Sequence, residues 1–205
     1  MSDNVAIILA GGKGERFGQQ KQFITFMGKP LWKHVYDKAK MIFKDENIVV
    51  VGVDVEGGKT RSYSIINGIN YFEQTQKTVN KVIILEAARP LVTVSQMEEL
   101  LNDPYVSSTF VAPLINTVIK KDGTYVDRKD YFDLLTPQAF DFKLLSKAYS
   151  SAEKWDLTDE TRLMYEIYGI KPHFIEGGQN LVKLTYIRDL PILENIAKQQ
   201  MEGLI

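Results

Sequence analysis

Short apolar runs recur along the chain and alternate with stretches of helical spacing. Residues 5–9 are continuously apolar and are followed at once by Ala10-Gly11-Gly12, which is typical of a strand buried on both faces of a sheet. The same pattern predicts further strands over residues 48–53, 81–85 and 109–112. Between them, helices are predicted to begin at Pro30 and to cover residues 64–72 and 95–101. This alternation predicts an α/β fold with a Rossmann-like, mostly parallel sheet flanked by helices, and ligands beyond the carboxyl ends of the strands.

The pattern changes after Pro113. Residues 115–128 alternate around Lys121-Asp122-Gly123, and Asp-Gly is a turn signal, so we predict a hairpin there. The hairpin forms a protruding β-arm of about residues 115–130. Helices are predicted over residues 141–152, 159–168 and 188–201, with a short strand over 171–176. Without repeats or a linker, residues 1–205 are expected to form a single domain.

The composition restricts the chemistry. The 205 residues contain no cysteine, which excludes disulfides, thiolate metal sites and a cysteine nucleophile. A net charge of −1 gives no argument for binding nucleic acid or an anionic membrane. The chain has no apolar stretch long enough to cross a membrane and no secretory signal pattern at its start. We therefore expect a cytoplasmic protein that binds neither nucleic acid nor membrane.

A glycine-rich loop, residues 10–18, follows the first strand directly. Glycines let a backbone approach a ligand closely, and a helix beginning near Lys13 would direct free N–H groups at an anion. Arg16 and Lys21 add positive charge nearby. The loop is not a P-loop, and Phe17 stands where a dinucleotide fingerprint needs its third glycine. Phosphate binding is favoured, and a plain glycine-rich turn is the alternative.

Seven ordered motifs make the reading specific. They are Ala10 to Gly18, Lys21-Gln22-Phe23 with Gly28-Lys29-Pro30, Gly58 to Ser64 with Asn67-Gly68, Ala87 to Pro90, Thr136-Pro137-Gln138, Thr158-Asp159 and Lys183-Leu184-Thr185 before Asp189-Leu190. Together they resemble the signature of the sugar-phosphate nucleotidyltransferases. More closely, the chain resembles the cytidylyltransferases that act on 2-C-methyl-D-erythritol 4-phosphate and on ribitol 5-phosphate. The motifs span nearly the whole chain, which the resemblance identifies as one nucleotidyltransferase domain.

The resemblance implies that CMP is transferred from CTP to a polyol or sugar phosphate and that pyrophosphate leaves. Such a transfer needs positioning and charge neutralisation more than a protein nucleophile. By resemblance, the catalytic cations are Arg16, Lys21 and Lys183. The nucleotide would be bound by Ala10, Gly11, Gly12, Gly14, Gly58, Ser64 and Arg89. Ser64 is also a candidate N-cap for its own helix.

The acceptor site is implied to draw on the arm. Thr117 and Arg128 match positions that bind the acceptor phosphate across a dimer interface, and Thr158 falls near the same pocket. A homodimer is therefore expected, although Thr117 is equally typical of an ordinary strand residue. Glu86 matches the position of a carboxylate that binds Mg²⁺, the expected cofactor.

Several residues depart from the methylerythritol pattern. Glu86 replaces an aspartate, Asn116 and Asn180 replace acids, and Gln20 replaces a proline. These changes favour an acceptor other than methylerythritol phosphate, such as a polyol phosphate for a surface polymer. The alternatives are a transferase that uses another nucleoside triphosphate and a CTP-binding relative that has lost catalysis. An NAD-dependent reductase is the least favoured reading.

Overall fold

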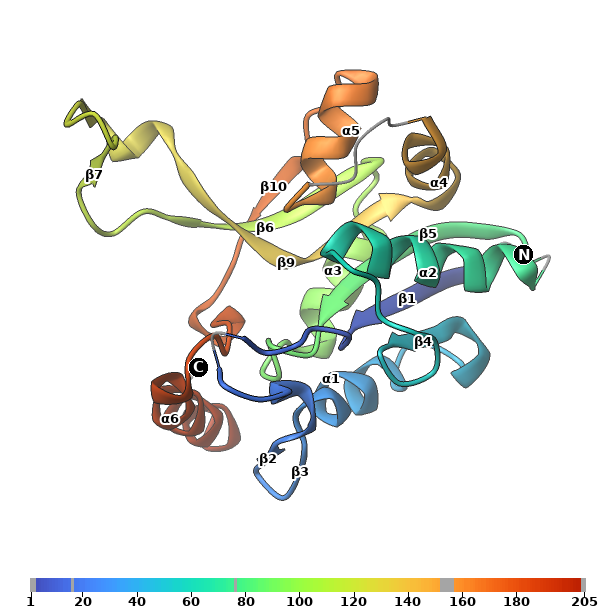
Figure 1. Cartoon of the computed structure of the whole chain (residues 1–205), viewed down its shortest axis with the longest axis horizontal. Helices are drawn as coiled ribbons and strands as arrows, with labels where there is room; N and C mark the ends of the chain where they lie inside the picture. The colour runs from blue at the N-terminus through green and yellow to red at the C-terminus, as the bar shows by residue number, and fades with distance from the viewer. Residues whose placement is uncertain (1–2, 16, 76, 152–156, 204–205) are drawn as a thin grey trace.

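A mostly parallel sheet forms the centre of the molecule. The computed structural model describes residues 3–15, 17–75, 77–151 and 157–203. Within these ranges a six-stranded sheet has the order β10-β6-β9-β5-β1-β4. Its strands are β1 (Asp3–Leu9), β4 (Ile48–Val51), β5 (Val79–Glu86), β6 (Ser107–Pro113), β9 (Phe132–Asp141) and β10 (His173–Glu176). Only β9 runs antiparallel to its neighbours, β5 and β6 (Figure 1). The predicted α/β fold is confirmed.

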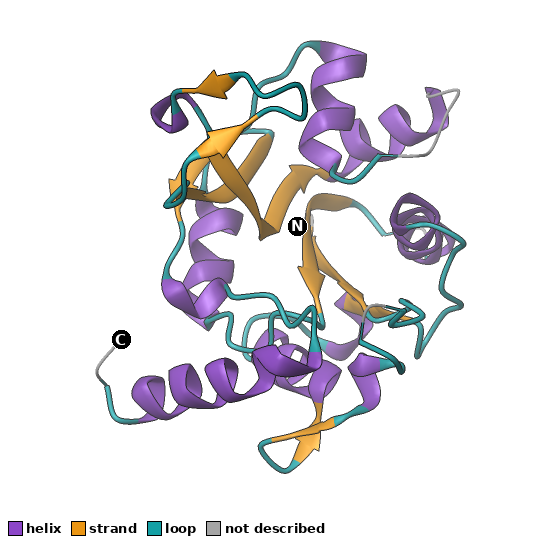
Figure 2. Ribbon diagram, turned by 60° about the vertical axis from the view of Figure 1, so that its left-hand side comes forward, coloured by secondary structure: helices purple, strands orange, loops and turns teal. Residues whose placement is uncertain are grey.

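Helices cover both faces of this sheet (Figure 2). They are α1 (Leu31–Ala39), α2 (Arg61–Gln74), α3 (Val94–Asn102), α4 (Phe142–Ser151), α5 (Glu160–Tyr168) and α6 (Leu190–Met201). Short 3₁₀ helices are η1 (Lys21–Phe23), η2 (Asp45–Asn47), η3 (Arg128–Asp130), η4 (Gln179–Leu181) and η5 (Ile187–Asp189). Side chains of α1 and α3 pack in one core cluster, whereas those of α2, α4 and α5 pack in another.

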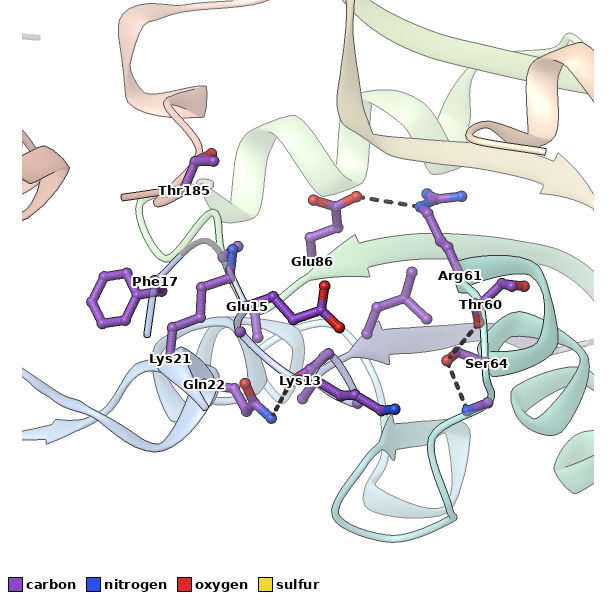
Figure 3. A pocket seen from close by; sticks show the side chains of 18 of the residues that line it. Lys13, Glu15, Phe17, Lys21, Gln22, Thr60, Arg61, Ser64, Glu86 and Thr185 are labelled. Carbon is purple, nitrogen blue, oxygen red and sulfur yellow. Dashed lines mark hydrogen bonds and ion pairs between the residues drawn. The ribbon is translucent and has the colours of Figure 1, made fainter. Parts of the chain in front are cut away.

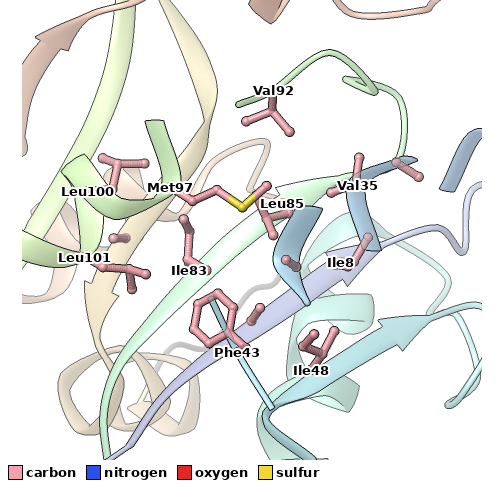
Figure 4. Close-up of a cluster of buried hydrophobic side chains, with 14 of the residues drawn as sticks. Ile8, Val35, Phe43, Ile48, Ile83, Leu85, Val92, Met97, Leu100 and Leu101 are labelled. Carbon is pink, nitrogen blue, oxygen red and sulfur yellow. The ribbon is translucent and has the colours of Figure 1, made fainter. Parts of the chain in front are cut away.

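The alternation of side chains along β1 explains why it reads as a continuous apolar run. Ala6 and Ile8 belong to the core under α1 and α3, while Val5 and Ile7 belong to the core under α2, α4 and α5. Figure 4 shows the first of these cores, in which Met97 of α3 lies near Leu85. Burial on both faces holds the carboxyl end of β1, and the loop that follows it, in a fixed place.

A third apolar cluster positions the C-terminal segment. Leu193 of α6 packs with Leu184, Leu31, Phe26 and Phe17, all of them buried. The leucine next to Lys183 is thereby packed in the same cluster as the glycine-rich loop, although 167 residues separate Leu184 from Phe17 in the sequence. This cluster brings the glycine-rich loop and the C-terminal segment to the same edge of the sheet.

The helix ends follow familiar capping rules. Thr60 is the N-cap of α2, and its hydroxyl accepts a hydrogen bond from the N–H of Tyr63. Thr93 and Gln96 form a reciprocal capping box at the start of α3. The prediction that Ser64 caps α2 is therefore wrong, because the helix begins one turn earlier and Ser64 lies inside it.

The predicted arm is an antiparallel hairpin. Strands β7 (Val118–Ile119) and β8 (Tyr125–Val126) pair with each other, and Gly123 in the turn between them has φ +88°. The arm projects well away from the main sheet in Figure 1. The hairpin expected from the Asp-Gly signal is confirmed.

Two local predictions differ from the structure. Strand β4 ends at Val51, since Gly52 has φ +101° and the N–H groups of Val53 and Asp54 donate back to the carbonyl of Val50. No helix begins near Lys13 among the described residues of this loop. Instead Gly14, with φ +71°, makes a turn whose carbonyl accepts from Phe17 and Gly18. Over the described ranges, no helix is long and apolar enough to cross a membrane.

A second hairpin contains the only non-glycine residue with positive φ among the described residues. Strands β2 (Thr25–Phe26) and β3 (Lys29–Pro30) are joined by Met27, with φ +44°, and Gly28, with φ +85°. Two consecutive positive φ values favour Asn-Gly, since asparagine tolerates the left-handed region better than methionine. Met27→Asn is expected to raise the free energy of unfolding by about 0.5–1 kcal/mol in urea denaturation.

A matched control exists in Met41, which is 74% exposed and has no positive φ. Met41→Asn should change the free energy of unfolding by less than about 0.5 kcal/mol. Equal effects of the two substitutions would show that the turn conformation does not limit stability.

Candidate functional site

A cavity lies where the carboxyl ends of the parallel strands meet. It has a volume of about 510 Å³. The loop after β1 forms one wall, the start of α2 a second, and the end of β5 with the segment around Lys183 the remainder (Figure 3). Ligands of open α/β sheets bind at this edge. The sequence placed the candidate site at this edge because the glycine-rich loop follows β1.

Gly11, which lines the cavity, packs closely against two other glycine backbones behind it. A Cβ atom on Gly11 would lie 2.8 Å from the Cα of Gly57, and one on Gly57 would lie 2.9 Å from the Cα of Gly11. A Cβ on Gly52 would meet the Cα of Gly11 at 2.6 Å. No side chain fits between these backbone segments, so at Gly11 the wall of the cavity is bare backbone.

This packing predicts different results at two adjacent glycines. Gly11→Ala should lower the free energy of unfolding by about 1–3 kcal/mol, because the new methyl group pushes two backbones apart. Gly12→Ala should have little effect on folding, since no atom lies within 4 Å of its added Cβ. Thermal or urea unfolding without nucleotide tests both. If Gly12→Ala proves as destabilising as Gly11→Ala, the packing behind Gly11 is not what demands glycine.

Polar groups at the start of α2 are held in a small hydrogen-bond network. The Ser64 hydroxyl accepts from the N–H of Gly58 at 3.0 Å and donates to the Thr60 carbonyl at 3.2 Å. On the opposite wall, the Gln22 amide donates to the Gly12 carbonyl at 3.0 Å. The predicted nucleotide-binding positions Ala10, Gly11, Gly12, Gly14, Gly58 and Ser64 all line the cavity.

Basic side chains line the cavity. Five basic and two acidic residues line the cavity among the described residues, an excess that suits a polyanion. Lys21 donates from Nζ to the Leu184 carbonyl at 2.7 Å, which places it beside the segment that carries Lys183. The structure therefore brings the predicted Lys21 and Lys183 together. Arg16, the third predicted catalytic cation, lies outside the described residues.

Glu86, at the end of β5, lies between two cations. Its Oε1 is 3.4 Å from Arg61 Nε, and its Oε2 is 2.5 Å from Lys183 Nζ. Burial alone would raise the pKa of this carboxyl, but the charges of Lys183 and Arg61 outweigh it and lower the pKa to about 2. The carboxylate is therefore ionised and held by ion pairs on both oxygens.

This arrangement does not fit a magnesium ion held by the protein. Each Glu86 oxygen is already in contact with a cation. Over the described residues, no group of three or more potential metal-binding side chains gathers anywhere. Magnesium dependence, and Glu86 as its ligand, therefore stay predictions from the sequence.

The residues expected at the acceptor site lie apart from the cavity. Thr117 and Arg128 are exposed on the arm, where Arg128 Nη1 donates to the Ile115 carbonyl. Thr158 is exposed just before α5. Arg89, expected at the nucleotide, is buried and donates to Thr136 Oγ1 at 2.8 Å and to the Leu181 carbonyl. Arg89 does not line the cavity and holds the loop after β5 against its neighbours.

Asn180, one of the departures from the methylerythritol pattern, is also buried. Its amide exchanges hydrogen bonds with that of Gln96, at 2.7 and 3.2 Å, and donates to the Leu91 carbonyl at 3.1 Å. This residue fixes the path of the segment leading to Lys183 rather than facing the cavity.

Comparison with known proteins assigns the chain to a family. Residues 4–199 match the family described as IspD, 2-C-methyl-D-erythritol 4-phosphate cytidylyltransferase. The chain belongs to this family. The resemblance drawn from the sequence motifs is confirmed, and the protein is a cytidylyltransferase.

Relatives of this cytidylyltransferase differ in the acceptor that they are named for. The 2-C-methyl-D-erythritol 4-phosphate cytidylyltransferase of Thermotoga neapolitana is 32% identical over 222 residues, covering 96% of this chain and 97% of the relative. The D-ribitol-5-phosphate cytidylyltransferase of Xenopus tropicalis is 30% identical over 236 residues, covering 96% of this chain and 57% of the relative. The structure of the bifunctional IspDF from Campylobacter jejuni aligns with a TM-score of 0.80 and 26% identity, covering 94% of this chain and 55% of that one.

The structure adds residues to the cytidylyltransferase site that sequence reasoning missed. Lys13, Glu15 and Lys59 also line the cavity. Behind it, Glu160 is completely buried and pairs with Arg61. The motif around Gly58 gave a signal for Arg61. Glu160 gave none, because a glutamate in the first turn of a helix is common, where it interacts favourably with the helix dipole. No sequence pattern distinguishes it.

Proposed function

We propose that the chain, as one nucleotidyltransferase domain over residues 1–205, transfers CMP from CTP to a small polyol phosphate. The observation that carries the proposal is the convergence of Lys21, Arg61 and Lys183 on one glycine-lined cavity. These cations come from three distant segments and suit a triphosphate, and the glycines leave room for a base and ribose. The cytoplasmic location expected from the sequence stays a prediction.

In the proposed reaction, an oxygen of the acceptor phosphate attacks the α-phosphorus of CTP. The new P–O bond forms as the bond from the α-phosphorus to the bridging oxygen breaks, and that electron pair leaves with pyrophosphate. Lys21 and Lys183 neutralise charge that grows on the phosphates, and Arg16 is assigned the same role from the sequence. The transition state is stabilised by fixed positive charge that needs no rearrangement during the step.

The acceptor is proposed to be a polyol phosphate. Relatives named for two different polyol phosphates support this class. Glu86 and Asn116 differ from the methylerythritol pattern, which favours a polyol other than methylerythritol, such as ribitol. The proposed product is a CDP-polyol.

A pyrophosphate-release screen tests the proposal. CTP is paired in turn with methylerythritol 4-phosphate, ribitol 5-phosphate, glycerol phosphates and sugar phosphates, each with magnesium and with EDTA. We expect release with CTP and one polyol phosphate. Release with UTP or GTP instead would reassign the nucleotide, and CTP binding without any release would support a relative that has lost catalysis.

We further propose that the protein acts as a homodimer through the arm. Ile115, Ile119 and Tyr125 are 84%, 52% and 73% exposed on it. Pairing of this projecting hairpin with a second copy would remove its apolar side chains from water. Two-fold symmetry is the commonest arrangement of such dimers. Arg128 would then reach the cavity of the partner.

Complementation tests this shared site. Arg128→Ala and Lys21→Ala should each be nearly inactive, and mixing them should restore part of the activity. Hybrid dimers contain one site with both native residues, so recovery should follow subunit exchange measured by mass spectrometry. If subunits exchange and activity stays absent, the arm does not complete a neighbouring site.

A further inference from the structure

A chain of charged and polar groups runs from the helical layer into the cavity. The Tyr149 hydroxyl on α4 donates to Glu160 Oε1 at 3.0 Å, and Arg61 Nη1 donates to Glu160 Oε2. Arg61 Nε then faces Glu86 Oε1 at 3.4 Å, and Glu86 Oε2 faces Lys183 Nζ at 2.5 Å. Figure 3 shows the Arg61–Glu86 part of this chain at the cavity wall.

Glu160 differs in its position from Glu86, the other carboxylate of this network. It has no exposed surface and does not line the cavity, so it cannot touch a ligand there. Its link to the site runs through Arg61, whose side chain is 20% exposed. A buried carboxylate far from solvent is costly unless a cation and hydrogen bonds hold it.

Arg61 is the cation that both carboxylates of this network contact. Burial lowers and the charges of Glu160 and Glu86 raise the pKa of Arg61, and the net direction is upward, so the guanidinium stays charged. Because both carboxylates compete for this one guanidinium, the strength of the Glu160 contact determines how firmly Arg61 attracts Glu86. That attraction in turn determines how Glu86 is divided between Arg61 and Lys183.

We infer that Glu160 is a positioning residue for catalysis, which acts through Arg61 and Glu86 to hold the Lys183 ammonium at the cavity. Glu86 belongs to the same network, and its carboxylate holds the Lys183 ammonium until a phosphate takes the place of the carboxylate. The inference rests on the proposed function for its catalytic consequence, but the position of Lys183 is testable without any turnover.

Neutralising Glu160 should redistribute the contacts. Without a charge on Glu160, Arg61 pairs more fully with Glu86, and Glu86 is drawn from Lys183. The ammonium then moves freely, which places it less often beside the reacting phosphates. Misplacement of a catalytic group by about 1 Å lowers the rate by up to about 100-fold.

The first experiment measures the exposure of Lys183. The enzyme without substrates is treated with an amine-acylating reagent, and modification at Lys183 is followed by peptide mass spectrometry. Glu160→Gln should increase the labelling rate at Lys183 several-fold. Glu166→Gln is the matched control, since Glu166 lies on the same helix in an exposed pair with Arg162, and it should leave the rate unchanged. Equal labelling of Lys183 in the parent and Glu160→Gln would overturn the inference.

The second experiment is a double-mutant cycle in steady-state CMP transfer. Glu160→Gln should lower kcat by about 10- to 100-fold with a much smaller change in KM for CTP. In a Lys183→Ala background the same substitution should have almost no further effect, because its target is gone. Additive losses would show that Glu160 acts only on folding or on other groups.

A second variant and the labelling readout distinguish a folding defect or an inactive parent from a failure of the positioning role. If Glu160→Gln does not fold, Glu160→Asp keeps the charge but withdraws the carboxylate from Arg61, and it should shift both readouts in the same direction by less. If the parent transfers CMP to no acceptor, the proposed function fails while labelling still decides the position of Lys183. If the parent is active and labelling does not change, only the positioning role fails.

Discussion

Replacing Lys21 with alanine is expected to lower kcat by about 10²- to 10³-fold, with a much smaller change in CTP affinity. Lys21 lines the cavity and is anchored by its bond to the Leu184 carbonyl, next to Lys183. A cation in this place offsets charge that develops on departing pyrophosphate, so its effect is greater in the transition state than in the ground state. Steady-state kinetics together with calorimetric CTP binding measure the two effects separately.

Lys29 gives the control for this prediction. It lies outside the cavity lining in a half-exposed ion pair with Asp37. Lys29→Ala removes the same charge and should leave kcat close to that of the parent. If Lys21→Ala retains near-normal turnover, Lys21 has no part in the chemistry, whatever its contact with the ligand.

Arg61→Ala is expected to lower the free energy of unfolding by about 3–5 kcal/mol at neutral pH. The substitution leaves Glu160 buried without its guanidinium partner and removes one cation from Glu86. The loss should be measured by urea or thermal unfolding. It exceeds what the removal of a surface arginine would cause.

The pH dependence of this loss has a defined sign. In the parent, Glu86 has a pKa lowered to about 2, so its contribution is present above the pKa of the unfolded chain and is lost as pH falls toward 2. Burial raises the pKa of Glu160, and without Arg61 it should rise further. Protonation then relieves the variant first, so the difference from the parent should shrink as pH falls below neutral.

Arg162→Ala provides the comparison. Arg162 pairs with Glu166 four residues away at 2.7 Å, with side chains 62% and 45% exposed. Its removal should lower the free energy of unfolding by less than about 1 kcal/mol at every pH. Similar losses in the two variants would mean that the buried network contributes no more than a surface pair.

Much of the fold was predictable because its strands are apolar on both faces. Residues 5–9 and 81–85 show this pattern plainly, and the arm was marked by Asp122-Gly123. Strand β9 was missed, since it is interrupted by Pro137 and carries Gln138 in its interior. The structure accommodates the proline at an irregularity, where the pairing of β6 with β9 shifts register between Thr109 and Val111.

The site was predictable to the extent that its residues belong to short motifs. The glycine-rich loop, Lys21, Gly58, Glu86 and Lys183 were all found this way, and the structure gathers them around one cavity. The conformation of the glycine-rich loop was not predictable, because a turn at Gly14 takes the place of the expected helix. The buried partnership of Arg61 with Glu160 spans 99 residues of sequence and depends on how α2 and α5 pack. No local pattern carries that information.

The fate of the α-phosphate of CTP tests the central claim most directly. The enzyme is incubated with a polyol phosphate and CTP labelled with ³²P at either the α- or the γ-position, and the products are separated. Label from the α-position should appear in a new cytidine-containing polyol product, and label from the γ-position should appear in pyrophosphate. Appearance of the γ-label in the polyol, or no transfer of α-label to any polyol phosphate, would contradict the assignment as a cytidylyltransferase acting on a polyol phosphate.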